Sequence, residues 1–279
     1  MKTLEQVRNA FKSTDKESNN LPNNYYPFWN MKDGDQAVIR FLPDANQDNP
    51  TGFLVEKVMH TLTINGEFKS VPCLSMYNES CPICAVSQKY YKAEDKENGK
   101  KYWKKKQHIA QAIIVEDPLV DENGVQSPYQ GQVKYVTLGF QLFGIIKAAF
   151  EDGELDEVPY AFEGGTDFII KKTKQGDFAT YSLGSKFARK STDLDQDTVA
   201  AVQQQLIDLA ILLPKNPGVE NVEGMLEAAM TGSEYSAGSS SSASDNGETT
   251  TTSAVSVTAD DVDQDDILAQ IRNRRKQQA

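Results

Sequence analysis

The segment HTLTINGEFKSVPCLSMYNESCPIC, residues 60–84, carries the residues on which the fold depends. It contains all three cysteines of the chain and one of its two histidines, in the set His60, Cys73, Cys81 and Cys84. Zinc prefers four tetrahedral thiolate and imidazole ligands, and the tight C-P-I-C turn can supply two of them. Three cysteines and one histidine saturate the metal, so we predict one structural Zn²⁺ without an open position.

Other interpretations of the same residues remain open. Cys81 and Cys84 could form a redox pair beside an unrelated third cysteine, or all three cysteines could be buried without a ligand role. His108 could replace His60, although its place in an expected strand favours a role in the core or along a groove. In a chain whose N-terminus lacks a signal-peptide pattern, three cysteines indicate a reducing cytosol.

A lysine-rich segment, residues 92–106, follows the metal motif and holds seven lysines against three acids. Aromatic side chains are interleaved with it at Tyr90, Tyr91, Tyr102 and Trp103. Lysines attract a phosphate backbone and aromatic rings stack on bases, so this mixture favours single-stranded nucleic acid. The alternative is an ordinary solvated face.

The net charge of −11 by itself argues against a nucleic-acid partner, but the acidity is unevenly distributed. Residues 219–279 hold eleven acids against four bases. Within them, residues 233–259 consist mostly of Ser, Thr, Ala and Gly, a composition that predicts disorder. This linker leads to an acidic peptide with Asp260, Asp261, Asp263, Asp265 and Asp266. The alternative is a tail that only keeps the protein soluble.

Strand patterns dominate the middle of the chain. Apolar and β-branched runs predict strands at residues 37–42, 53–64, 67–68, 108–115, 132–138, 168–173 and 178–183, with Asn65-Gly66 as a hairpin turn. Helical spacing predicts helices at residues 81–92, 140–150 and 194–213, and a short amphipathic one near the N-terminus. The expected class is therefore α+β and β-rich, with a small barrel or a partly open sheet.

The sequence lacks the motifs of several classes of enzyme. The sequence has no P-loop, no G-x-G-x-x-G, no H-E-x-x-H and no G-x-S-x-G, and His60 is not followed by the glutamate of zinc deaminases. A zinc nuclease would need an open metal position. Its most apolar stretch, near residues 206–213, is too short to span a bilayer. We therefore expect neither an enzyme nor a membrane protein.

Taken in order, short motifs over residues 35–190 resemble those of the helix-destabilising single-stranded-DNA-binding proteins of T4-like bacteriophages. The matching pieces are the predicted zinc set, the lysine-rich segment, the acidic Ser-rich end, Ala37–Pro43, Ile113–Pro118, Lys134-Tyr135, Phe162–Gly164 and Phe168–Lys171. Each piece is weak alone, whereas their ordered combination is specific.

The resemblance implies a three-part architecture. Residues 1–20 would form an arm for self-association along DNA, through Lys12, Ser13 and Thr14. Residues 21–230 would form an oligonucleotide/oligosaccharide-binding (OB) fold core, with a zinc subdomain at about residues 57–106. Residues 231–279 would form a disordered linker and an acidic tail that contacts replication and recombination proteins.

The resemblance also implies a function. The protein would coat single-stranded DNA cooperatively, with little sequence preference, during phage DNA replication, recombination and repair in the cytoplasm of the infected bacterial host. The DNA contacts carried over by position are Arg40, Tyr77, Tyr91, Tyr102, Lys104, Lys105, Tyr135, Phe178 and Tyr181, and the lysine-rich segment adds Lys100, Lys101, Trp103 and Lys106. The alternatives are a zinc-stabilised protein scaffold and a single-stranded RNA binder.

Overall fold

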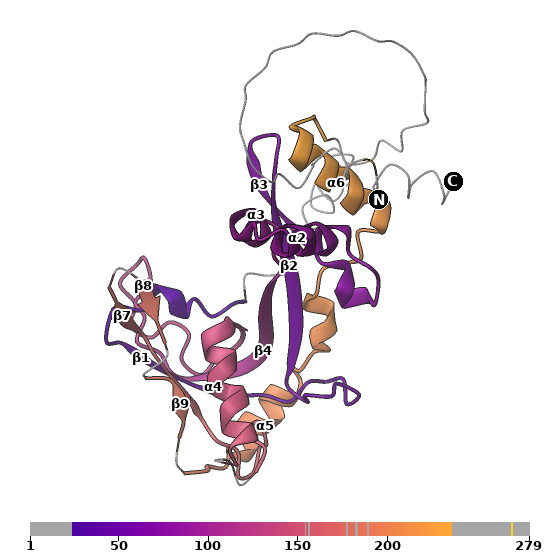
Figure 1. Ribbon diagram of the computed structural model, residues 1–279. Coiled ribbons are helices and arrows are strands. Elements are labelled where there is room, and N and C mark those ends of the chain that lie inside the picture. The colour runs from indigo at the N-terminus through magenta and orange to yellow at the C-terminus, as the bar shows by residue number, and fades with distance from the viewer. Residues whose placement is uncertain are drawn as a thin grey trace, which may run out of the picture. The chain divides into compact units, whose positions relative to one another are not determined.

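The computed structural model describes residues 24–235, apart from positions 154, 156, 177, 182, 183 and 189, together with residue 269 (Figure 1). The expected N-terminal helix, the self-association residues Lys12, Ser13 and Thr14, and the five tail aspartates lie outside the described residues. The chain divides into two compact units. Of the described stretch 24–235, unit 1 contains residues 24–57 and 106–213, and unit 2 contains residues 58–105 and 214–235.

Unit 1 is built on an antiparallel sheet. Strand β1 (Gln36–Phe41) pairs with β4 (Lys105–Glu116) on one side and with β6 (Phe168–Lys171) on the other. Strand β5 (Val133–Leu138) pairs with β4, and β9 (Lys186–Phe187) pairs with β6. Five of the six β1 residues are buried, as expected for a central strand covered on both faces. These elements confirm the strands predicted at 37–42, 108–115 and 132–138.

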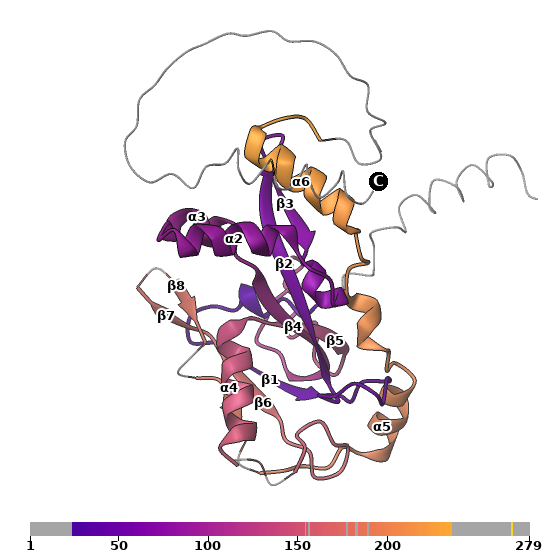
Figure 2. The ribbon, with the colours of Figure 1, turned by 45° about the vertical axis from the view of Figure 1, so that its right-hand side comes forward.

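The core of unit 1 is aromatic. Phe41 lies among Phe53, Phe168 and Phe187, with ring centroids 5.2, 5.6 and 6.3 Å away. Helix α4 (Phe140–Glu151), which confirms the helix predicted at 140–150, packs against β5 and β9. Figure 2 shows α4 together with the strands β1, β4, β5 and β6 of this unit. A short 3₁₀ helix, η1 (Phe28–Asn30), adds Phe28 to the same core. The expected α+β class is confirmed, and the OB topology stays a prediction.

A separate hairpin follows β6. Strands β7 (Thr173–Gln175) and β8 (Phe178–Thr180) pair only with each other in the part of the chain that the structure describes. Gly176, with φ of 62°, takes the left-handed conformation of the turn. The predicted strand 168–173 is thus two strands, β6 and β7, separated at Lys172.

The prediction of one continuous helix over residues 194–213 is wrong. Helix α5 (Gln196–Gln203) ends early, and a 3₁₀ helix, η3 (Leu209–Leu212), begins only after an irregular segment. Tertiary contacts explain the break, because the Gln111 amide donates to the Gln205 carbonyl at 2.7 Å. Asp208 then accepts from the Ala210 amide at 2.9 Å and starts the second turn.

Unit 2 is organised around a second hairpin. Strand β2 (Leu54–Ile64), whose residues from Val58 onward belong to this unit, pairs with β3 (Glu67–Pro72). Asn65 and Gly66 have φ of 53° and 79°, so the predicted hairpin turn is confirmed. The chain continues through a 3₁₀ helix, η2 (Leu74–Tyr77), and helices α2 (Pro82–Lys92) and α3 (Lys96–Lys101).

Helix α6 (Val219–Thr231) completes unit 2. Val222 and Leu226 are fully buried in the same apolar cluster as Val58 and Ile83, and the helix packs against α2 (Figure 1). The helix predicted at 81–92 is confirmed as α2, whereas the sequence analysis predicted neither α3 nor α6. Within the described residues, no helix has both the length and the apolar character needed to cross a bilayer.

Arg40, a predicted phosphate contact, lies in the interior of unit 1 with only 1% of its surface exposed. Its Nε donates to Asp167 Oδ1 at 2.7 Å, and its terminal nitrogens donate to the backbone and hydroxyl oxygens of Thr192. A phosphate contact requires an accessible guanidinium. This burial argues against the expected DNA contact and gives Arg40 a structural role instead.

We expect the Arg40–Asp167 pair to stabilise unit 1. The variant Asp167→Ala should lower the free energy of unfolding by about 3 kcal/mol, because it leaves a buried charge without its partner. Urea unfolding measures this difference, with Glu122→Ala as an exposed control that should change it by about 0.5 kcal/mol or less. Equal stability of the two variants would contradict the assignment.

Candidate metal centre and nucleic-acid interface

The four predicted ligands converge in unit 2. One donor atom from each of His60, Cys73, Cys81 and Cys84 lies within 4.8 Å of the other three. His60 Nε2 is 3.5 Å from the sulfurs of both Cys81 and Cys84, and the sulfurs of Cys73 and Cys84 are also 3.5 Å apart. The sequence therefore identified a group of side chains that can hold one metal ion.

The spacing of the donors suits zinc. Tetrahedral bonds of about 2.3 Å to sulfur and about 2.0–2.1 Å to nitrogen place two sulfurs about 3.8 Å apart and a sulfur and a nitrogen about 3.6 Å apart. The donor separations of 3.5 Å are close to both values. Three soft thiolates and one imidazole are ligands that Zn²⁺ prefers, and together they fill its four tetrahedral positions.

Local structure brings the ligands together. In the β2–β3 hairpin, His60 lies opposite Val71, and the Cys73 amide extends the pairing by donating to the Val58 carbonyl at 3.0 Å. Cys81 precedes the first residue of α2, Pro82, whose fixed φ favours a helix start. Cys84 then lies in the first turn of the helix, so hairpin and helix supply two ligands each.

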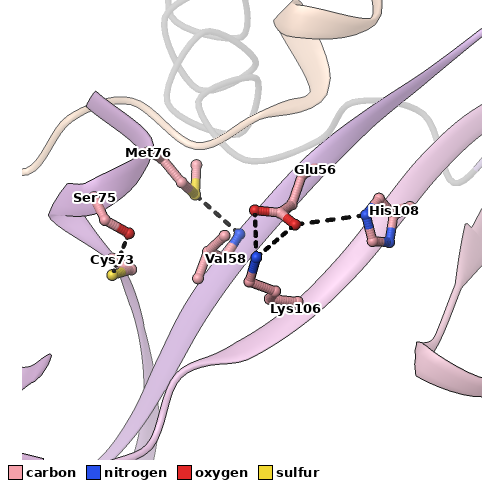
Figure 3. A network of polar contacts seen from close by, with 7 residues as sticks. All are labelled: Glu56, Val58, Cys73, Ser75, Met76, Lys106 and His108. Carbon is pink, nitrogen blue, oxygen red and sulfur yellow. Dashed lines mark hydrogen bonds and ion pairs between the residues drawn. The ribbon is translucent and has the colours of Figure 1, made fainter. Parts of the chain in front are cut away.

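Surrounding polar groups orient two of the ligands. His60 Nδ1 lies 3.0 Å from the Tyr102 carbonyl, which can only accept, so Nδ1 carries the proton and Nε2 faces the sulfurs. The Ser75 hydroxyl is 3.1 Å from the Cys73 sulfur, and the Val58 amide donates to the Met76 sulfur at 2.9 Å (Figure 3). The contacts of Ser75 and Met76 hold η2 beside the hairpin. The contact with the Tyr102 carbonyl holds the imidazole in the tautomer that a metal needs.

The electrostatics of the cluster favour a cation. Hydrogen bonds with Cys81 and Cys84 lower the pKa of the Cys73 thiol, whereas hydrogen bonds with Cys73 and Cys81, followed by burial, raise the pKa of the Cys84 thiol. Burial lowers the pKa of His60, but hydrogen bonds with Cys73 and Cys81 outweigh it and raise the pKa to about 9. A cation bound to all four donors would stabilise the ionised thiols.

The lysine-rich segment continues from the metal cluster through α2 and α3. Asp95 caps α3 by accepting from the Asn98 backbone amide at 3.0 Å. Hydrogen bonds from the Asn98 side chain and then from its backbone amide lower the pKa of Asp95. Ser87 of α2 donates to the Gly99 carbonyl at 2.7 Å. The Tyr91 ring lies directly on Gly99, where an added Cβ would approach it to 3.0 Å. Glycine thus permits α2 and α3 to pack closely.

Two aromatic side chains remain accessible on this surface. Tyr91 and Trp103 meet edge to face with ring centroids 5.4 Å apart and are 36% and 48% exposed. Lys104 is partly exposed beside Trp103. The other predicted lysine contacts are exposed, namely Lys100, Lys101, Lys105 and Lys106. The same segment thus carries two accessible rings and four exposed lysines, and their role as DNA contacts stays a prediction.

Tyr102 and Tyr135 are packed inside their units rather than presented to a ligand. Tyr102 stacks on Tyr90 with an interplanar angle of 7° and is 3% exposed, and this burial, followed by the effect of Tyr90, raises its pKa to about 12. Tyr135, in unit 1, is 8% exposed and meets Tyr25 edge to face. Their burial argues against the expected stacking on bases.

The remaining predicted aromatic contacts differ in exposure. The Tyr77 hydroxyl donates to the Pro214 carbonyl at 2.5 Å, and the Tyr181 ring packs edge to face on Phe28, so both are partly engaged within their units. Burial raises the pKa of each hydroxyl. Phe178 is 80% exposed on the β7–β8 hairpin. Among these three, Phe178 has the ring most available for stacking.

Within unit 1, Lys106 forms an ion pair that sequence analysis did not reveal. Its Nζ lies 2.9 and 3.1 Å from the two carboxylate oxygens of Glu56, and His108 Nε2 lies 3.6 Å from the same carboxylate (Figure 3). His108 stacks on Phe143, and burial lowers its pKa despite the nearby Glu56. His108 is thus a core residue, and Glu56 competes with any anion for Lys106.

Comparison with known proteins identifies the family. A family model described as gp32 DNA binding protein like matches residues 32–230. The chain belongs to the gp32-like DNA-binding protein family. No match was found among curated proteins. The resemblance read from the ordered motifs is thereby confirmed, and the chain is a DNA-binding protein whose matched region contains the metal-ligand cluster and the lysine-rich segment.

The four converging donors lead us to expect one zinc ion per chain. Elemental analysis of protein purified without chelator should give about one equivalent of zinc, because the closed Cys₃His set binds this ion tightly. The variant Cys84→Ser should lose most of the metal, whereas His108→Ala should keep it. Wild-type protein without bound metal would falsify the site. Loss of the metal in His108→Ala would mean that His108, rather than His60, supplies the imidazole ligand.

Proposed function

We propose that the protein binds and coats single-stranded DNA with little sequence preference. The observation that carries this proposal is the surface of unit 2 where the accessible rings of Tyr91 and Trp103 adjoin a run of exposed lysines. Ammonium groups release counterions from a phosphate backbone, while the rings stack on bases without reading their identity. Membership of a DNA-binding family supports the same ligand.

The proposed contacts are a subset of those expected from sequence. We assign phosphate contacts to Lys100, Lys101, Lys104, Lys105 and Lys106, and stacking to Tyr91, Trp103 and Phe178. Tyr77 and Tyr181 are secondary contacts, because each is partly engaged within its unit. Arg40, Tyr102 and Tyr135 stabilise the interior instead.

Zn²⁺ is the proposed occupant of the Cys₃His cluster, with a structural role. Four protein ligands would leave no open position for water, so the ion would not activate a nucleophile. Its contribution is to hold hairpin and helix together, and through His60 it also anchors the Tyr102 carbonyl, one residue before Trp103. This arrangement supports binding rather than catalysis.

Other parts of the proposal rest on sequence and family resemblance. We propose that the N-terminal arm, with Lys12, Ser13 and Thr14, makes binding cooperative by contacting the next copy along the DNA. The acidic tail would recruit replication and recombination proteins through Asp260, Asp261, Asp263, Asp265 and Asp266. The setting would be phage DNA replication, recombination and repair in the infected bacterial host.

Salt dependence of binding tests the lysine assignment. For the variant Lys104→Ala/Lys105→Ala, the slope of log affinity against log salt concentration should fall by about 1.4, since each single-strand phosphate contact contributes about 0.7. Glu56→Gln should change affinity in the opposite direction, by up to about fivefold at low salt, because an exposed ion pair is worth about 0–1 kcal/mol. Fluorescence anisotropy of a labelled oligothymidylate measures both.

Lys147→Ala is the matched control, since Lys147 is an exposed lysine of α4 outside the segment. It should leave affinity and slope unchanged. Equal effects of Lys147→Ala and the double variant would contradict the assignment. Competition between oligothymidylate and RNA of the same length tests the RNA alternative, which predicts tighter binding of the RNA. If the protein binds neither strand, the zinc-stabilised scaffold is the better account.

We also propose that the acidic tail competes with DNA for the lysines. Removing residues 236–279 should raise affinity most at low salt, because salt screens the competing charges. The cut follows Tyr235, whose backbone amide and carbonyl pair with the Asn65 side chain at 3.3 and 3.4 Å, so the segment after α6 keeps its contact with the hairpin turn. Affinity and salt slope that equal those of the full chain would exclude this competition.

A further inference from the structure

A cavity of about 260 Å³ opens beside the metal ligands in unit 2. It is lined by Ser75, Cys81, Cys84, Ser87, Gln88, Trp103 and Lys104. We propose that this cavity binds a single unstacked base of the DNA strand, with Trp103 as the stacking face and Gln88 as the group that contacts the base edge. The inference deepens the proposed function and rests on it.

The cavity is distinct from the position of the metal. Only two of the four predicted ligands, Cys81 and Cys84, line it, whereas His60 and Cys73 do not. A water molecule takes about 30 Å³ in the liquid, so the space holds several waters and exceeds what one cation needs. It is also smaller than the clefts of about 300–1,000 Å³ that enclose drug-sized ligands. One flat heterocycle suits this size.

The lining has one aromatic face and two available donors. Trp103 is 48% exposed, and it meets Tyr91 in a T-shaped contact at an interplanar angle of 88°. Among the described residues, neither the Gln88 amide nor the Lys104 ammonium has a hydrogen-bond partner. By contrast, the Ser87 hydroxyl already donates to the Gly99 carbonyl. An occupant with a carbonyl oxygen on its edge accepts from the Gln88 amide, as thymine does, and leaves the Lys104 ammonium for a phosphate.

Charge decides which part of a nucleotide enters. With the proposed Zn²⁺ bound, three thiolates and one divalent cation would leave a net charge of −1 at the end of the cavity formed by Cys81 and Cys84. A phosphate would be repelled there, whereas a neutral base would not. Lys104 supplies a positive charge in the same lining. The base therefore points toward the metal cluster and its phosphate lies near Lys104.

Single-tryptophan variants test stacking at Trp103, because the chain has only one other tryptophan, Trp29. In Trp29→Phe, an oligothymidylate should quench the remaining Trp103 emission. An oligomer of the same length made of abasic deoxyribose phosphates should bind without quenching. In the reverse variant, Trp103→Phe, the emission of Trp29 should stay unchanged. Trp103→Ala should weaken oligothymidylate binding by about 5-fold to 150-fold, as expected for one lost stacking contact.

Gln88→Ala tests contact with the base edge. Loss of one hydrogen bond should reduce the ratio of oligothymidylate to oligoadenylate affinity by about 2-fold to 10-fold relative to wild type. Gln141→Ala removes an exposed amide from α4 and should leave this ratio unchanged. A merely electrostatic surface would change both affinities equally and leave the ratio constant in either variant.

The outcomes separate the two proposals. Oligothymidylate that binds by anisotropy without changing Trp103 emission, or with an unaltered base ratio in Gln88→Ala, overturns the base pocket and leaves single-strand binding intact. Quenching by the abasic oligomer also overturns it, because no base is then present. Absence of binding by every oligomer overturns the proposed function together with the pocket.

Discussion

The structure of unit 2 depends on the convergence of one imidazole and three sulfurs within 4.8 Å. These groups come from a hairpin, the residue before a 3₁₀ helix and the first turn of α2, so a metal bound to them cross-links segments that are up to 24 residues apart. Such a site contributes folding free energy directly. His60 transmits the constraint to the Tyr102 carbonyl, and hence to the neighbouring residue Trp103, whose ring is accessible.

Positive and negative charges lie in different segments of the chain, so the net charge does not describe any one surface. The total of −11 includes a net −7 from residues 219–279, while residues 92–106 are positive. Within unit 1, Glu56 neutralises Lys106 when no strand is present. The same protein can thus be acidic overall, attract a polyanion at one surface and limit that attraction with its own carboxylates. In the proposed function, binding would therefore be an exchange of anionic partners at the lysines.

Local chemistry determined which predictions succeeded. Asn65-Gly66 predicted its hairpin because only that turn type needs two left-handed residues, and the ligand set was found because cysteine and histidine are rare in this chain. Burial was harder to predict. Tyrosines such as Tyr102 occur both on surfaces and in interiors, and Arg40 is buried only because Asp167, 127 residues away, pairs with it. Helix α6 escaped prediction because its apolar partners in α2 lie more than 120 residues away.

Amide hydrogen exchange of the zinc-loaded full chain, with and without an oligothymidylate, tests most directly whether the metal-anchored segment binds the strand. The account predicts slower exchange on DNA binding in residues 84–106, with β7–β8 as a second site through Phe178, and little change in α4. Protection of α4 with unchanged exchange throughout residues 84–106 would contradict it, because the strand would then lie away from the lysines and rings that the metal cluster positions.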